Sequence, residues 1–243
     1  MTFTVPMMLF SLLTIPAAHQ DAFDKDIFTT ASGNLEITFI GHGSLMIRFD
    51  GKIIYIDPYS ALADYSKLPK ADLILITHEH FDHLDPVTID KIRAKDTKVV
   101  LTEKSAEKVF DGIVMRNGDV QTIIGIRIEA VPAYNIIHRR ENGQPFHPKN
   151  HGNGFILTLG DKRIYVAGDT ENTTEIKALR NVDIAFLPMN LPYTMTPEMV
   201  ADAAQAFEPK VLYPYHYGDT DTSRIVALLK NTEHIEVRIR NMK

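Results

Sequence analysis

The most constraining feature of the sequence is a cluster of metal-type side chains in the segment Thr77–Asp85, THEHFDHLD. An apolar run of strand length, ADLILIT, leads into it, and the helix-like stretch VTIDKIRAK follows Pro86. Imidazole nitrogens and carboxylate oxygens are the ligands that zinc and similar divalent ions take in proteins. Residues two apart in an extended segment point to the same side, so His78 and His80 can bind one ion together.

The same segment offers ligands for a second ion. A turn around Phe81 would direct Asp82 and His83 toward an ion a few Å away, as two-metal hydrolases require. The alternative is a polar loop that opens a helix, with Asp85 as its N-cap and the histidines merely solvated. We favour the metal site because four potential ligands follow one buried strand.

Composition indicates one substantial folded domain. The chain has 243 residues, of which 44% are hydrophobic and 23% charged, so a packed core is expected and wholesale disorder is not. The net charge of −5 argues against a general affinity for nucleic acid, and a small-molecule substrate is expected instead. The sequence contains no cysteine, so any metal must be bound by His, Asp, Glu or Asn. Nothing in the sequence indicates an oligomeric state.

The N-terminal segment 1–20 differs from the rest. Its apolar, uncharged stretch Val5–Ala18 is short for a membrane span and resembles the hydrophobic region of a secretory signal, with Ala17 and Ala18 near a candidate cleavage point. No Lys or Arg precedes Lys25, so the charged region of a signal is missing, and a short core helix is the alternative. A signal would place the protein in the periplasm or outside the cell, and otherwise we expect it in the cytoplasm. No other window resembles a membrane span.

Residues 21–33 are predicted to form a polar linker, and residues 34–243 a single domain. The domain alternates short β-type runs with helical stretches, which predicts a layered α/β fold. Residues 124–133 alternate as an edge-type strand would. Residues 134–154 are polar and rich in Gly and Asn, and a loop of this length in a compact domain is usually functional or disordered.

Metal-type residues recur where predicted strands end. Asp57 ends KIIYID, the His78 segment ends DLILI, Asp169 follows RIYVA, and His216 ends VLYPYH. In layered α/β folds such strand ends gather along one rim, where ligands bind. We therefore expect these side chains to converge.

This pattern resembles the metallo-β-lactamase-fold metal-dependent hydrolase superfamily over nearly all of the chain after about residue 34. The family signature HxHxDH stands at residues 78–83, and Asp57, Asp169 and His216 follow in the family's order. The segments GHGSLMI, IDPYS, VPAYN, YVAGDT and LPYTM look most like the lactonase-like and N-acyl-phosphatidylethanolamine phospholipase D-like branch.

The resemblance implies a four-layer αββα sandwich with two metal ions at one edge, zinc or else manganese or iron. It implies that His78 and His80 bind the first ion, that Asp169 bridges the two, and that the second ion is bound by Asp82, His83 and His216. Asp82 and Asp169 would be the catalytic carboxylates. Asp57 is interpreted as the residue that holds a ligand histidine in its metal-binding tautomer, with an Asp-Pro turn as the alternative.

One position departs from the family pattern. Asn135 stands where the third histidine of the first ion is usual, and an amide oxygen is a weaker zinc ligand than imidazole. Asn135 could bind the metal weakly, His147 or His151 could supply the missing imidazole, or the first site could be poorly occupied. We favour a loop histidine, His147 before His151, with Lys149 as a nearby anion-binding charge.

Further pocket residues are His42, in a hairpin turn near the rim, and Tyr193, after the DIAFLP strand. The function implied is a hydrolase that uses a metal-bound hydroxide to cleave an ester, lactone or phosphodiester bond of a small, anionic substrate. The alternative is a degenerate or redox metal-binding protein on the same fold.

Overall fold

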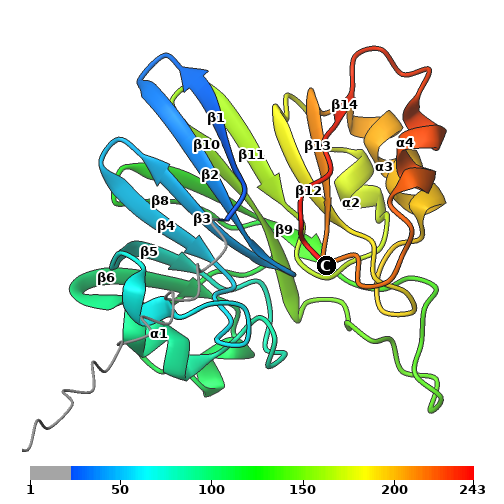
Figure 1. Ribbon diagram of the computed structural model, residues 1–243. Helices are drawn as coiled ribbons and strands as arrows, with labels where there is room; N and C mark the ends of the chain where they lie inside the picture. Colours follow the sequence, from blue (N-terminus) through cyan, green and yellow to red (C-terminus); the bar gives the residue numbers. More distant parts are fainter. Residues whose placement is uncertain (1–22) are drawn as a thin grey trace, which may run out of the picture.

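The computed structural model describes residues 23–243, so the signal-like segment 1–20 lies outside the described residues. Within them the chain forms two seven-stranded sheets that pack face to face (Figure 1). Each sheet comes from one continuous half of the chain, strands β1–β7 in the first and β8–β14 in the second. Helices cover the outer faces, which confirms the predicted αββα sandwich.

The first sheet follows the chain from one edge to the other. Its strands are β1 (Lys25–Thr30), β2 (Gly33–Gly41), β3 (Ser44–Phe49), β4 (Lys52–Ile56), β5 (Ala71–Leu75), β6 (Arg93–Leu101) and β7 (Ile113–Val114). The short GHG and DG turns make β2, β3 and β4 antiparallel, whereas β4 to β7 are parallel and need longer connections. Those connections hold η1 (Tyr65–Lys67), α1 (Pro86–Ile92) and η2 (Ser105–Glu107).

The predicted linker at residues 21–33 is wrong over residues 25–30. These residues form β1, which pairs in register with β2 along its whole length. The composition is polar because β1 is an edge strand with one face toward solvent, and its pairing comes from backbone hydrogen bonds that composition does not reveal.

The second sheet consists of β8 (Val120–Ile123), β9 (Ile126–Ala133), β10 (Gly152–Leu159), β11 (Lys162–Val166), β12 (Ile184–Pro188), β13 (Val211–Tyr215) and β14 (Glu236–Val237). Its outer face carries α2 (Thr174–Lys177), α3 (Pro197–Phe207) and α4 (Ser223–Leu229). β9 was expected at an edge but pairs with both β8 and β10. It alternates because its outward residues, among them Arg127, face solvent where no helix covers the sheet.

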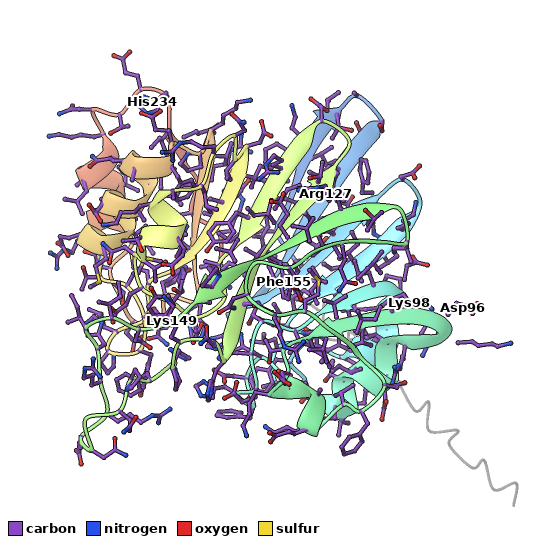
Figure 2. The ribbon with its side chains drawn as sticks, turned by 180° about the vertical axis from the view of Figure 1, so that it is seen from behind. Asp96, Lys98, Arg127, Lys149, Phe155 and His234 are labelled. Atoms are coloured by element: carbon purple, nitrogen blue, oxygen red, sulfur yellow. The ribbon has the colours of Figure 1, made fainter. Side chains whose placement is uncertain are left out.

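Three apolar layers hold these elements together. The largest lies between the two sheets and includes Phe39, Phe155 and Phe186, all at most 2% exposed. Figure 2 shows Phe155 in the interior of the molecule. The other two lie between the second sheet and α2–α4, and between the first sheet and α1. Burying one such aromatic side chain contributes roughly 1.5–3 kcal/mol, so the layers fix how the strand ends meet.

None of the described helices has both the length and the apolar character that a membrane crossing requires.

Candidate metal centre

The ends of four strands bring the predicted ligands to one rim of the sandwich. Asp57 follows β4, His78 lies shortly after β5, Asp169 shortly after β11, and His216 follows β13. Backbone hydrogen bonds join the two sheets here, since Asn153 N donates to Thr77 O at 2.8 Å and His216 N donates to His42 O at 3.1 Å. The sequence-based expectation that these strand ends converge is therefore confirmed.

The first cluster consists of three imidazoles. Ring nitrogens of His78, His80 and His147 all lie within 4.8 Å of one another. His78 Nε2 is 3.1 Å from His80 Nδ1. His147 Nε2 points to the same place and is 3.2 Å from Asp169 Oδ2. Three nitrogens directed at one point form a donor set suited to zinc.

The second cluster lies beside the first and contains His42, Asp82, His83 and His216 within the same 4.8 Å limit. Asp82 Oδ2 is 3.9 Å from His83 Nε2 and 3.8 Å from His216 Nε2. His42 Nε2 contacts Asp82 Oδ2 at 3.0 Å, and its ring lies 3.6 Å from that of His216. His42 is thus at the centre itself rather than only at the rim.

Asp169 lies between the two clusters. Its Oδ1 is 3.6 Å from His83 Nε2, and its Oδ2 is 3.6 Å from His216 Nε2 and 3.2 Å from His147 Nε2. One carboxylate that faces nitrogens of both clusters is placed to bridge two ions.

Unsatisfied polar atoms test whether this centre fits a metal. Among the described residues, His83 Nε2, His216 Nε2 and Asp169 Oδ1 are buried and have no hydrogen-bond partner. Buried polar atoms without a partner are costly and uncommon, and here both histidine nitrogens lie 3.6 Å from the Asp169 carboxylate. Their lone pairs are the ones a divalent ion would take, so the residues present fit a metal centre.

Asp57 orients one histidine of each cluster. It is completely buried, and its Oδ2 accepts hydrogen bonds from His83 Nδ1 at 2.8 Å and from the Thr77 hydroxyl at 2.6 Å. Because that hydroxyl donates to Asp57, it accepts from His78 Nδ1, which is 3.0 Å away. Both histidines are thereby held with the proton on Nδ1 and Nε2 free for an ion. This supports the predicted role of Asp57 over a simple turn.

Burial sets the charge state of several ligands. It holds the pKa of His78 well below the ordinary value, lowers that of His80, and lowers that of His216 to about 4. These imidazoles are neutral at pH 7, as metal ligands must be. Burial alone would raise the pKa of Asp82, but the His42 hydrogen bond and the charge of His83 bring it to about 2.

Similarity to known proteins agrees with this geometry. A family model described as a beta-lactamase superfamily domain matches residues 36–216. The chain belongs to the beta-lactamase superfamily. A relative in that superfamily, a UPF0173 metal-dependent hydrolase from Flavobacterium johnsoniae, is 34% identical over 199 residues, which cover 75% of this chain and 84% of that protein.

Two solved structures also resemble the chain. A provisionally named metal-dependent hydrolase from Parabacteroides distasonis has 51% sequence identity and a TM-score of 0.87, and the match covers 91% of this chain and 100% of that one. A metallo hydrolase from Ignicoccus hospitalis has 24% identity and a TM-score of 0.71 over 86% of this chain and 96% of its own, and shares the fold.

The third imidazole of the first cluster comes from the long loop. His147 belongs to the first cluster, so the preference for a loop histidine agrees with the geometry. Asn135 is not directed at the cluster, contrary to its predicted place among the ligands. Its Oδ1 accepts from His147 N and Nδ1, and its Nδ2 donates to Glu171 Oε1 and the Tyr193 carbonyl. With both ends of the amide used by protein groups, Asn135 has no free lone pair directed at an ion.

The sequence reasoning missed two residues of the centre. Glu171 is completely buried two positions after Asp169 and accepts hydrogen bonds from the backbone of residues 136–138. Asn190 follows β12, and its amide lies 3.3 Å from His216 Nδ1. Glu171 and Asn190 both follow predicted strands, as Asp57 and Asp169 do. That position in the sequence could have identified them.

A pocket of about 420 Å³ opens onto both clusters. Its wall includes Tyr193, as predicted, together with Phe146 and Arg140. Lys149 does not line it, contrary to expectation, because its ammonium pairs with Glu175 Oε1 at 2.9 Å and lies over the Tyr134 ring. Figure 2 shows Lys149 on the loop that leads to β10. The cation at this pocket is therefore Arg140.

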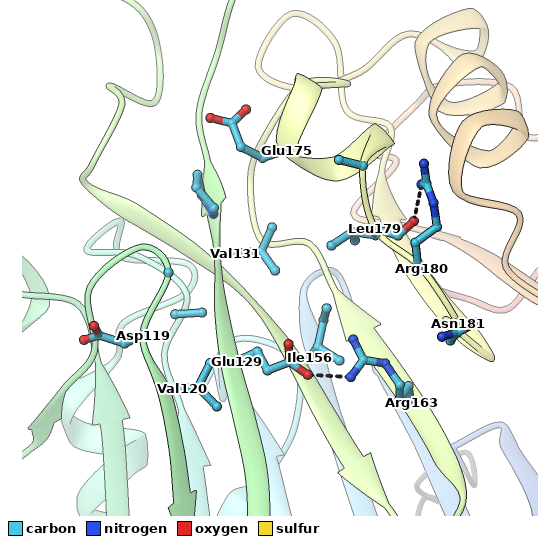
Figure 3. A pocket seen from close by; sticks show the side chains of 14 residues that line it. Asp119, Val120, Glu129, Val131, Ile156, Arg163, Glu175, Leu179, Arg180 and Asn181 are labelled. Carbon is cyan, nitrogen blue, oxygen red and sulfur yellow. Dashed lines mark hydrogen bonds and ion pairs between the residues drawn. The ribbon is translucent and has the colours of Figure 1, made fainter.

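A wider hollow of about 470 Å³ lies elsewhere, on the outer face of the second sheet beside α2 (Figure 3). Its lining includes Val131, Ile156 and the ion pair between Arg163 Nη1 and Glu129 Oε1 at 2.5 Å. It contains no histidine and none of the clustered ligands. A choice of site by cavity volume alone would therefore select this hollow and not the pocket at the two clusters.

Proposed function

We propose that this metal-dependent hydrolase of the metallo-β-lactamase fold binds two divalent ions and cleaves an ester, lactone or phosphodiester bond of a small anionic substrate. The observation that carries the proposal is the set of buried, partnerless atoms His83 Nε2, His216 Nε2 and Asp169 Oδ1. Nitrogen-rich donors favour zinc, and the carboxylates would also accept manganese or iron.

Residues from both halves of the chain would hold the two ions. The first would be bound by His78, His80 and His147, and the second by Asp82, His83 and His216, with Asp169 shared. When bound, two such metal ions lower the pKa of a water that they share, so that hydroxide is available near pH 7. In the metal-free protein, neighbouring histidines hold the pKa of the Asp82 and Asp169 carboxyls low against the effect of burial, so both would meet an incoming ion as carboxylates.

The pocket favours an anion with an apolar part. Arg140 lines it, and its guanidinium is fixed by a hydrogen bond to Phe146 O at 3.2 Å and lies 5.1 Å from the Phe146 ring centre. Phe146 packs edge to face with Tyr193 at 5.0 Å. A phosphate or carboxylate could pair with Arg140 while an apolar group contacts these two rings.

The alternative of a degenerate site rested on Asn135 in place of a histidine. The place of His147 beside His78 and His80 supports a complete first site instead. The narrower likeness to the lactonase-like and phospholipase D-like branch remains a prediction.

Removal of the pocket cation tests the substrate class. Arg140→Ala should raise KM about tenfold or more for a phosphodiester or carboxylate ester and leave kcat nearly unchanged, because the ion ligands are untouched. A neutral ester of similar size should show no change in KM. The measurement is steady-state kinetics on a matched pair of charged and neutral esters.

Lys149→Ala is the matched control, since Lys149 is on the same loop but turned to Glu175. Its KM should equal that of the unmodified protein. Faster turnover of the neutral ester, with no effect of Arg140→Ala on the charged one, would show that the substrate is not recognised as an anion.

A further inference from the structure

We infer that Asn135 and Glu171 are positioning residues that hold His147 in the one tautomer and orientation able to bind the first ion. The inference rests on the metal centre proposed above. Asn135 stands where the family usually has its third histidine. Its role would be to support His147, the residue that replaces that histidine.

Asn135 and His147 close the base of the loop excursion 136–146. Asn135 N donates to His147 O at 2.9 Å, and His147 N donates to Asn135 Oδ1 at 2.7 Å. The same Oδ1 is 2.8 Å from His147 Nδ1. An amide oxygen only accepts, so Nδ1 carries the proton and Nε2 keeps its lone pair, which faces Asp169. The side chain of Asn135 thus selects the metal-binding tautomer.

The orientation of the Asn135 amide is itself fixed. The Tyr193 carbonyl and Glu171 Oε1 can only accept from the side-chain nitrogen, at 2.8 and 3.0 Å. The backbone N–H of His147 requires an oxygen on the other side. A flipped amide would place donors against donors and acceptors against acceptors at these contacts. Only the His147 tautomer with its proton on Nδ1 therefore fits.

Glu171 anchors this arrangement. Its Oε2 accepts from Ile136 N and Ile137 N, each at 2.7 Å. Its Oε1 accepts from His138 N at 2.7 Å and from His138 Nδ1 at 2.8 Å, in addition to Asn135. Donors around both oxygens stabilise a carboxylate that is completely buried. The negative charge polarises the Asn135 amide and so strengthens its oxygen as an acceptor for His147.

The chain therefore contains a relay from a buried carboxylate through an amide to a ligand imidazole. Supports of this kind typically change metal affinity by about 10–100-fold when removed. Asp57 and Asn190 support the histidines of the second cluster, His83 and His216, and their contacts do not involve Asn135. Loss of Asn135 should consequently weaken the binding of the first ion and leave the affinity for the second ion unchanged.

Cobalt titration of metal-free protein tests the inference. Each Co²⁺ is followed by its visible absorption and by competition with a chelator, which reports two affinities without any substrate. In Asn135→Ala, one equivalent should bind about 10–100-fold more weakly, and the other should keep its affinity and spectrum. Glu171→Gln should weaken the same equivalent, because the new amide nitrogen cannot accept from the loop donors.

Asn142→Ala is the matched control. Asn142 lies in the same loop and is exposed, and its Oδ1 accepts only from Gln144 N within the described part of the chain. Its two cobalt affinities should equal those of the unmodified protein. If Asn135→Ala does not fold, Glu171→Gln carries the test.

Two results would overturn the inference. One is a folded Asn135→Ala protein with both affinities within about twofold of the unmodified value. The other is an equal loss at both equivalents that Asn142→Ala reproduces, which would indicate general loosening of the loop. Absence of cobalt binding to the unmodified protein would instead contradict the proposed metal centre.

Discussion

Individual residues of the centre are held in conformations that local preferences disfavour. His42, Asp57 and His216 have φ values of 50°, 43° and 46°, in the left-handed region. Each such residue costs about 1–3 kcal/mol, and such strain is common at functional sites, where the surrounding structure enforces it. The two backbone bonds that cross between the sheets at this rim are part of that surrounding structure. No sequence pattern could have predicted these angles, because tertiary contacts impose them.

Sequence spacing predicted that the side chains of the HxHxDH segment gather at one place, since their geometry follows from a strand end and a turn. His147 was harder to assign. It depends on how the excursion 136–146 returns to its base, and the contacts that decide this involve Glu171, which follows a different strand.

The raised pKa of His83 predicts that the stability of the metal-free protein depends on pH. Burial lowers its pKa, but the charges of Asp169, Asp57 and Asp82 outweigh burial and raise the pKa to about 9 from 6.5. A raised folded-state pKa means that protonated His83 stabilises the fold fully below pH 6.5, and that this contribution is lost as pH rises to about 9. The loss is at most about 3.5 kcal/mol, because each tenfold change in proton affinity corresponds to about 1.4 kcal/mol.

Melting in the presence of a chelator checks this. Tm should fall between pH 6.5 and 9 in the unmodified protein and fall less in His83→Gln, which lacks the titrating group. Parallel profiles for the two proteins would contradict the assignment.

At the scale of elements, the hydrophobic patterns predicted most strands because one face of each is buried. The hydrophobic pattern did not predict β1, because this strand is held by backbone pairing with β2 and by polar contacts with the other sheet. Asp26 of β1 accepts from Arg240 Nη2 at 2.7 Å and from Arg238 Nη1 at 3.2 Å, and also from the Tyr213 hydroxyl. This network joins the β1 edge to the β13–β14 edge, and it could not be inferred from residues so distant in sequence.

Asp26→Ala should therefore destabilise the protein by about 2–4 kcal/mol, because it leaves two guanidinium groups and a hydroxyl without their partly buried acceptor. Urea unfolding at pH 7 measures the change. Asp111→Ala is the control, since its ion pair with Arg93 is exposed and should contribute under about 1 kcal/mol. Equal losses in the two variants would show that the Asp26 network is not a special link between the sheets.

At the scale of the whole molecule, the centre lies where the two halves of the chain meet. The first sheet supplies the HxHxDH segment, and the second supplies His147, Asp169 and His216. The resemblance predicted this architecture and most of the residues that the structure brings together at the centre. It did not predict the pocket, whose wall comes from the irregular loop, and substrate identity depends on that wall.

Calorimetric titration of metal-free protein with Zn²⁺ tests the central claim most directly. About two ions per chain should bind to the unmodified protein, and His80→Ala should lose the high-affinity binding of one, because it removes one imidazole of the first cluster. A protein that binds no zinc, or a folded His80→Ala variant with the same two affinities, would contradict the dinuclear centre.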